Sequence, residues 1–189
     1  MPNPRTRART IRGQAVAQLR RFGEDRRGVT VIEFAFVAGP LMALLIGILQ
    51  VSLTFFAQQN LETSAERISR GLMTGATQAA NLSQTDFKAM ACTKLPAFLK
   101  CANLMVDVQV ATSFSSVNTS PPTITYDASG NVNNSWKYQP GAPGEIVIVK
   151  TMYLWDVNKG PLGFDLSTLS SGKRLLIATS VFKTEPYKI

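Results

Sequence analysis

Residues 26–34 read Arg26-Arg27-Gly28-Val29-Thr30-Val31-Ile32-Glu33-Phe34, and no further charged residue follows until Glu62. The first part of this uncharged run, up to Phe56, is dense in apolar side chains. A helix needs about 20 predominantly apolar residues to cross the hydrocarbon core of a bilayer. The run is long enough to do so, and we expect a transmembrane helix over about residues 34–57.

Basic residues are concentrated before the apolar run. The chain has 189 residues, a formal net charge of +8 and no histidine. Eight arginines lie in residues 1–28, against the two acids Glu24 and Asp25. Positive charge next to a membrane segment marks its cytoplasmic side. We therefore interpret residues 1–28 as a basic cytoplasmic leader, and we expect no nucleic acid among the partners.

The apolar run continues into the pattern of an amphipathic helix. Apolar residues recur there at steps of three and four: Leu61, Ala65, Ile68, Leu72, Ala76 and Ala79. This spacing places them on one face of a helix. We predict a single long helix over residues 29–80, which is membrane-spanning at first and amphipathic afterwards.

Residues 81–189 predict a small α+β domain. A short helix is expected within 81–103, capped by Asn81 or Ser83. Strands are expected at 104–115, 144–156 and 173–184, and the second is apolar on both faces, which favours a central position. Since loops join these strands, including a hairpin tip at 127–131, we predict an antiparallel sheet packed on the outer half of the long helix.

Two cysteines, Cys92 and Cys101, lie on either side of Pro96. On one straight helix their Cα atoms would be about 13.5 Å apart, whereas a disulfide needs about 4.4–6.8 Å. Pro96 can reverse the chain between them, and the charge asymmetry places this region outside the cytoplasm, where disulfides persist. We expect a Cys92–Cys101 disulfide, with two reduced thiols as the alternative. Two cysteines without histidine are too few for a metal site.

The sequence gives no indication of catalysis. Without histidine, a serine or cysteine nucleophile would need a lysine or carboxylate partner, and no spacing singles one out. There is also no glycine-rich phosphate loop. We expect the protein not to be an enzyme and to need no cofactor.

Glu33 is the informative carboxylate, because it lies at the edge of the apolar run. A charge at mid-bilayer costs at least about 2.5–3.5 kcal/mol, and such residues are usually functional. The alternative is a glutamate that reaches the lipid headgroups. If the chain were cut after Gly28, Val29 would carry a new ammonium one helical turn from Glu33. In a bundle of parallel helices, Glu33 of one subunit could pair with the Val29 ammonium of a displaced neighbour.

The segment from Gly28 to Phe34 resembles the processing site of type IV pilins. More specifically, the chain resembles the TadE-like pseudopilins of the tight-adherence (Tad/Flp) pilus system over about residues 26–187. The likeness rests on an ordered set of short motifs: Arg27-Gly28 before Glu33-Phe34, Pro40, Cys92-x-x-Leu95-Pro96 through Cys101, Val106–Val110, Asp127–Gly130, Pro140-Gly141 before Glu145–Val149, and Phe182–Tyr187.

The resemblance implies a pilin-like, single-pass inner-membrane precursor with a cytoplasmic N-terminus and a periplasmic C-terminal domain. A prepilin peptidase would cut it after Gly28, and the mature protein would act as a minor pilin in assembly of Flp pili, supporting adhesion and biofilm formation. The implied partners are sister pseudopilins, the major Flp pilin, the inner-membrane assembly platform and the lipid bilayer. The TadE, TadF or TadG subtype, and incorporation into an extracellular pilus, stay open.

Two other interpretations fit the residues. One is an unprocessed single-pass inner-membrane protein with a periplasmic sensing or binding domain. The other is a periplasmic scaffold of a secretion machine unrelated to pili. Cleavage after Gly28 distinguishes the pseudopilin from both.

Overall fold

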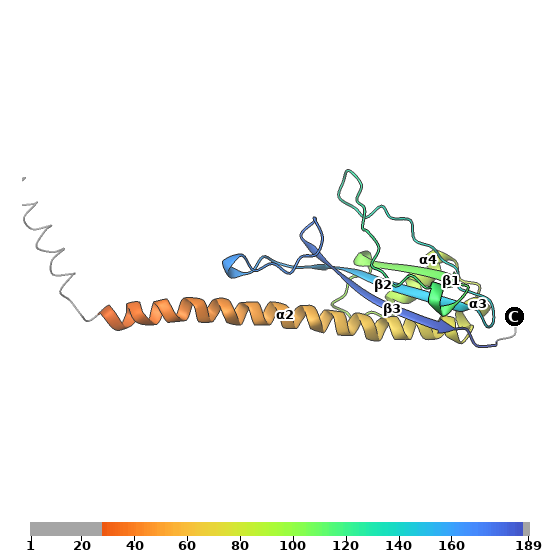
Figure 1. Cartoon of the computed structure of the whole chain (residues 1–189), viewed down its shortest axis with the longest axis horizontal. Helices are drawn as coiled ribbons and strands as arrows, with labels where there is room; N and C mark the ends of the chain where they lie inside the picture. The colour runs from red at the N-terminus through yellow and green to blue at the C-terminus, as the bar shows by residue number, and fades with distance from the viewer. Residues whose placement is uncertain (1–27, 187–189) are drawn as a thin grey trace, which may run out of the picture. The chain divides into compact units, whose positions relative to one another are not determined.

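The computed structural model describes residues 28–186, so all of the expected leader except Gly28 lies outside the described residues. The chain divides into two compact units between Leu45 and Ile46. Its elements are one long helix, short helical segments and a three-stranded antiparallel sheet (Figure 1). The α+β prediction is confirmed.

The long helix, α2, spans Val29–Met73 and continues through Pro40. It begins where the sequence predicts, but it ends before residue 80. Gly75 adopts a left-handed conformation with φ of 77°, which a right-handed helix cannot include and which commonly ends one. Residues Ala76–Ala79 therefore form a separate turn, α3. Ala76 and Ala79, expected on the buried face, are exposed.

One face of α2 forms the core of the second unit. Its buried apolar side chains follow the predicted three- and four-residue steps: Ala57, Leu61, Ala65, Ile68 and Leu72. They pack with Phe87 and Ala91 of a second helix, α4 (Gln84–Cys92), and with one face of the sheet. Ser83 caps α4, since its hydroxyl accepts a hydrogen bond from the Asp86 backbone N–H at 3.2 Å. Of the two expected caps, the structure therefore uses Ser83.

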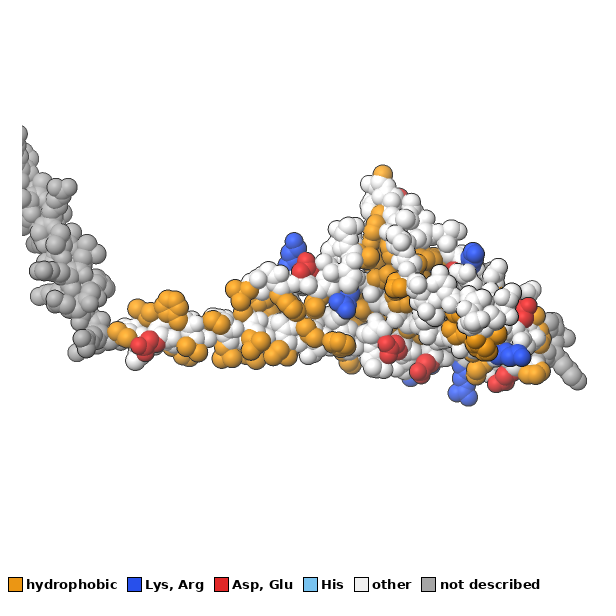
Figure 2. All heavy atoms as spheres, in the orientation of Figure 1, with side chains coloured by type: hydrophobic (Ala, Val, Ile, Leu, Met, Phe, Trp, Pro, Cys, Tyr) orange, Lys and Arg blue, Asp and Glu red, His pale blue; other side chains and the backbone are white. Residues whose placement is uncertain are grey.

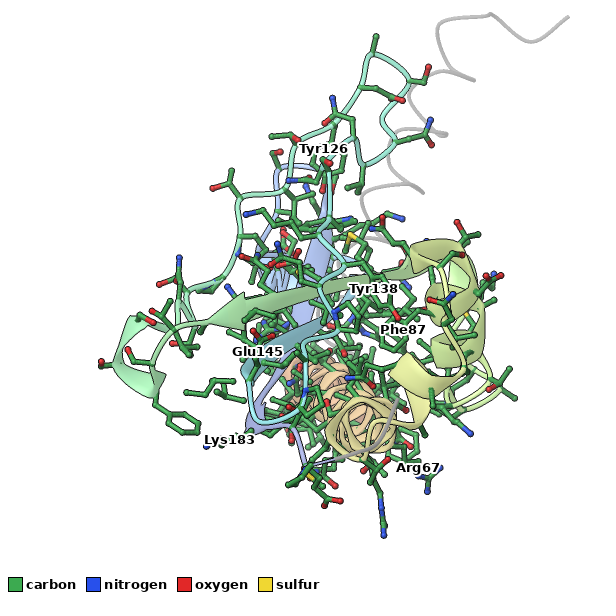
Figure 3. The ribbon with its side chains drawn as sticks, turned by 90° about the vertical axis from the view of Figure 1, so that its right-hand side faces the viewer. Arg67, Phe87, Tyr126, Tyr138, Glu145 and Lys183 are labelled. Carbon is green, nitrogen blue, oxygen red and sulfur yellow. A yellow bond between two sulfur atoms is a disulfide. The ribbon has the colours of Figure 1, made fainter. Side chains whose placement is uncertain are left out.

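The sheet has the order β1-β2-β3, with β1 at Leu104–Ala111, β2 at Ile146–Asp156 and β3 at Lys173–Lys183. Both pairings are antiparallel, and β2 is central as predicted. Inward-facing side chains such as Val108 and Val149 pack towards α2 and α4. The ring of Phe87 in α4 lies against the Tyr138 ring in a tilted arrangement, with centroids 5.0 Å apart (Figure 3).

The opposite face of the sheet is covered by irregular chain. Met105, Met152 and Leu154 form a second cluster beneath side chains of the β1–β2 and β2–β3 connections, namely Ile124, Val132, Trp136 and Leu169. Two charged residues of this face, Asp107 and Lys150, are also buried. Asp107 accepts a hydrogen bond from the Lys137 backbone N–H at 2.8 Å, and Lys150 donates to the Ser120 carbonyl at 2.8 Å. These bonds fix the β1–β2 connection to the sheet.

The expected hairpin tip at 127–131 is a tight turn. Tyr126 and Val132 form an isolated antiparallel bridge. The Asp127 carboxylate accepts hydrogen bonds from the backbone N–H groups of Ser129 and Asn131, each at 2.8 Å. These bonds, that from Asn131 first, hold the pKa of Asp127 below its ordinary value.

Candidate functional site

Gly28, Val29 and Glu33 lie together at the start of α2. Gly28 is exposed, and a side chain added there would meet nothing within 4 Å. Val29 is the first residue of α2 and is 45% exposed. Glu33 is also exposed and follows one helical turn later. The candidate cleavage point is therefore accessible, with a carboxylate one turn into the helix behind it.

The first part of α2 presents apolar side chains without protein cover. Its most apolar window has a mean hydropathy of 2.2, and none of that window is buried. Exposed large side chains include Phe34, Phe36, Leu41, Leu45, Leu49 and Phe55, and Figure 2 shows apolar side chains along this helix. By length and composition, α2 could cross a membrane. Orienting such a surface towards lipid would remove it from water.

The helix changes character near Ala57, the first apolar side chain of α2 that is buried against the sheet domain. Gln58 marks this transition, since its amide Nε2 donates to Glu62 Oε1 at 2.8 Å and to the Ile177 carbonyl of β3 at 3.0 Å. One continuous helix thus has an uncovered apolar segment followed by a segment that carries the sheet.

The Cys92–Cys101 disulfide is present, with Cα atoms 5.3 Å apart. The loop that it closes is packed against neighbouring elements. Phe98 stacks on Phe56 of α2 with ring centroids 5.3 Å apart. The Lys100 backbone N–H donates to the Tyr153 hydroxyl of β2 at 2.9 Å. The disulfide therefore holds a loop that connects α4, α2 and the sheet.

No group of three or more histidine, cysteine, aspartate or glutamate side chains suited to a metal ion occurs within residues 28–186. The Asp127, Ser129 and Asn131 side chains lie in the 127–131 tip, where the carboxylate is engaged by backbone N–H groups. The features that the structure does assemble are an accessible helix start, an apolar helix surface and a disulfide-closed loop.

The sequence does not indicate which polar side chains hold the helix to its domain. Gln58 is one such residue. Gln78 is another, since its Nε2 donates to the Leu72 carbonyl at 3.0 Å and to the Pro140 carbonyl at 2.7 Å. A glutamine in a helix carries no signal of its distant partner. For Gln58, its polar position at the end of an otherwise apolar run is the one hint that the sequence contains.

The model of the TadE-like protein family matches residues 28–70. The match begins at Gly28 and ends within α2, so the predicted resemblance is confirmed over this segment. The match covers 43 of the 189 residues, which is less than a quarter of the chain. No curated protein and no solved structure matches the chain significantly.

Proposed function

Because residues 28–70 carry a TadE-like segment, we propose that the protein is a minor pilin, or pseudopilin, for assembly of Tad (Flp) type IV-like pili. It enters the inner membrane as a single-pass precursor, with its N-terminus in the cytoplasm and residues 81–189 in the periplasm. A prepilin peptidase removes residues 1–28. The mature protein then joins sister pseudopilins and the major Flp pilin at the inner-membrane assembly platform, and supports adhesion and biofilm formation.

The main support for this proposal is that the family match and the long helix begin at almost the same residue. The family match starts at Gly28 and α2 starts at Val29. Hydrolysis of the Gly28–Val29 peptide bond adds one water and leaves a carboxylate on Gly28 and an ammonium on Val29. The cut therefore produces a subunit that begins with its apolar helix, with Glu33 one turn from the new charge.

After cleavage, the Val29 ammonium can compensate the negative charge of Glu33 at the membrane edge. An unpaired charge in hydrocarbon is costly, whereas opposite charges in a low-dielectric setting attract strongly. When the Val29 ammonium of one subunit meets Glu33 of another, each compensates the other, and the register between two helices becomes defined. The apolar faces of α2 supply the remaining contact. Assembly would thus depend on cleavage, because the uncut chain lacks the ammonium.

Cleavage is tested by substituting glycines on the same helix start. Gly28→Ala and Gly39→Ala each add a methyl group where nothing lies within 4 Å, so neither disturbs packing in the protein. In cells with active prepilin peptidase, Gly28→Ala is expected to leave only precursor, while Gly39→Ala is processed normally. Equal processing of both variants would contradict the proposal and favour the unprocessed membrane protein with a periplasmic sensing or binding domain.

The assembly role of Glu33 needs a second comparison. Glu33→Gln removes the charge at the membrane edge, and Glu66→Gln removes one from an exposed position of the same helix beside the domain. We expect Glu33→Gln to be processed but to lose pili or cross-links to sister pseudopilins, whereas Glu66→Gln keeps them. Normal pili with Glu33→Gln would show that this carboxylate is only an interfacial glutamate.

A further inference from the structure

The connection between β2 and β3 ends in a turn that exposes an apolar side chain. Leu162 is 92% exposed, the highest fraction among the exposed large hydrophobic residues of the described chain. It also has a left-handed backbone, with φ of 59° and ψ of 24°. This conformation is unfavourable for a residue with a side chain. Such strain clusters where a side chain has a functional contact to make.

The turn has a defined structure of its own. The Gly160 backbone N–H donates to the Phe164 carbonyl at 2.7 Å, and the Phe164 N–H donates to the Pro161 carbonyl at 3.2 Å. These bonds close the segment Gly160-Pro161-Leu162-Gly163-Phe164, which we call the apolar turn. Phe164 is itself 38% exposed. The apolar turn therefore presents Leu162 outwards, with a partly exposed aromatic ring in the same segment.

The connection touches α2 inside the uncharged run. Gln50 Nε2 donates to the Asn158 carbonyl at 3.4 Å, and a side chain added at Gly160 would come within 2.6 Å of Gln50 Oε1. Figure 1 shows the β2–β3 connection beside the helix in agreement with these contacts. If the hydrocarbon core begins at Phe34, about 20 residues place its outer boundary near Leu53. Gln50 and the chain beside it then lie just inside that boundary, about 4.5 Å below Leu53, and deeper if the span extends to residue 57.

Charged groups flank the apolar turn on both sides. Lys159 precedes it and Asp165 follows it, and both are exposed. The Asp165 carboxylate accepts a hydrogen bond from the Ser167 backbone N–H at 2.8 Å, which lowers its pKa with help from the nearby Lys159. Arg174 donates a hydrogen bond to the carbonyl of Leu166, the residue after Asp165, at 3.2 Å, and lines a cavity of about 140 Å³ with Val51 and Phe55 of α2. An apolar tip between charged groups is typical of a segment that lies at a membrane interface.

We propose that the apolar turn inserts Leu162 into the outer leaflet of the bilayer that α2 spans. The inference rests on the proposed membrane insertion of α2. A lipid surface is the occupant that the observations favour, because the turn meets α2 where the helix leaves the hydrocarbon. Leu162 and Phe164 enter the acyl boundary, while Lys159 and Asp165 remain among the headgroups. The turn thereby fixes the height of the sheet domain above the membrane until the subunit is extracted.

The test uses one fluorophore at three sites of the full chain. Both native cysteines are in the disulfide, so an introduced cysteine is the single free thiol. An NBD label is attached to Leu162→Cys, to Ser129→Cys in the polar tip, and to Leu45→Cys in the apolar run. The proteins are reconstituted in vesicles of phosphatidylethanolamine and phosphatidylglycerol containing doxyl lipids, with the quencher either near the headgroup or deep in the acyl chain.

We expect the label at Leu162→Cys to lose about half of its emission to the shallow quencher, as for a group about 5–10 Å below the surface. The label at Ser129→Cys should lose almost none, and the label at Leu45→Cys should respond to the deep quencher. Quenching at residue 45 without quenching at residue 162 overturns the inference and leaves the membrane span intact. Absence of quenching at residue 45 as well overturns the proposed insertion of α2.

Dilution of the protein distinguishes contact of the apolar turn with lipid from contact with a neighbouring chain. Quenching at residue 162 that persists at one chain per vesicle supports contact with lipid. A label at residue 162 that is shielded only at high protein density, and is unquenched when dilute, assigns the turn to a neighbouring chain and overturns the inference. Since Leu162 is almost fully exposed, its replacement should not unfold the domain, and retention of the disulfide on gels checks this.

Discussion

Removing the disulfide tests whether the Cys92–Cys101 loop holds the sheet domain to α2. The double substitution Cys92→Ser/Cys101→Ser opens a loop with a sequence separation of 9. For a loop of this size, the chain-entropy model gives a loss of about 2.7 kcal/mol in the free energy of unfolding. The structure adds a local consequence, because Phe98 of this loop stacks on Phe56 and Leu99 is buried.

The assay is urea unfolding of the full chain in detergent, followed by the fluorescence of Trp136, which packs against the sheet, and of Trp155, which lies in β2. With a slope of about 2 kcal/mol per molar urea, the midpoint should fall by more than about 1 M. Wild type under reductant should unfold at nearly the same midpoint as the double variant, which separates loop closure from loss of the sulfur atoms. An unchanged midpoint in both, with the disulfide present in untreated protein, would refute this reasoning.

Three further changes probe the fold at other points. Leu61→Ala removes a fully buried side chain and should lower the free energy of unfolding by about 2–5 kcal/mol, whereas Leu49→Ala, which is 62% exposed on the same helix, should leave the urea midpoint of the domain unchanged. Gly141→Ala should cost at least about 1–2 kcal/mol, because Gly141 has φ of +80° and the added carbon would lie 2.6 Å from Val147 Cγ2; a wild-type midpoint would contradict the assigned turn. The pKa of Asp127 is lower in the folded chain than its ordinary value of 3.8. The ionised carboxylate therefore stabilises the tip fully above pH 3.8, and this stabilisation is lost as the pH falls through the lower pKa of the folded chain. Protection of the Ser129 amide, measured as its exchange rate relative to an unstructured peptide at the same pH, should therefore fall as the pH drops below 3.8, and Asp127→Asn should remove this pH dependence.

The parts of the fold that the sequence predicts are those with a local or periodic signal. The steps from Leu61 to Leu72 predict the buried face of α2, and the apolar run in β2 predicts a central strand. The disulfide follows from Pro96 and from the expected compartment. In each case the deciding information lies within a few residues of the element, so periodicity and turn chemistry are sufficient.

The parts that the sequence does not predict depend on distant contacts. The helix ends at Met73 because Gly75 adopts a left-handed conformation, and a glycine in sequence does not reveal that choice. The sequence also does not predict that irregular chain covers the second face of the sheet. Ile124 and Trp136 belong to this chain, and hydrogen bonds such as that from Lys150 to the Ser120 carbonyl fix its position.

The candidate functional residues also divide into those that the sequence predicts and those that only the folded chain reveals. Gly28, Val29 and Glu33 are neighbours in sequence, so the residue numbers alone fix their spacing along a helix. Residues 157–172, in contrast, contain glycines and a proline that predict only a loop. The significance of the apolar turn depends on the exposure of Leu162 and on the contact of its connection with Gln50, and both are properties of the folded chain.

The N-terminus of the mature protein tests the central claim most directly. The protein is produced from the full-length sequence in cells with active prepilin peptidase and is isolated from their membranes. Its intact mass and N-terminal sequence are then determined. The account predicts a chain that begins Val29-Thr30-Val31-Ile32-Glu33, without residues 1–28. A chain that retains the arginine-rich arm in those cells, or one that begins at another residue of α2, would contradict it.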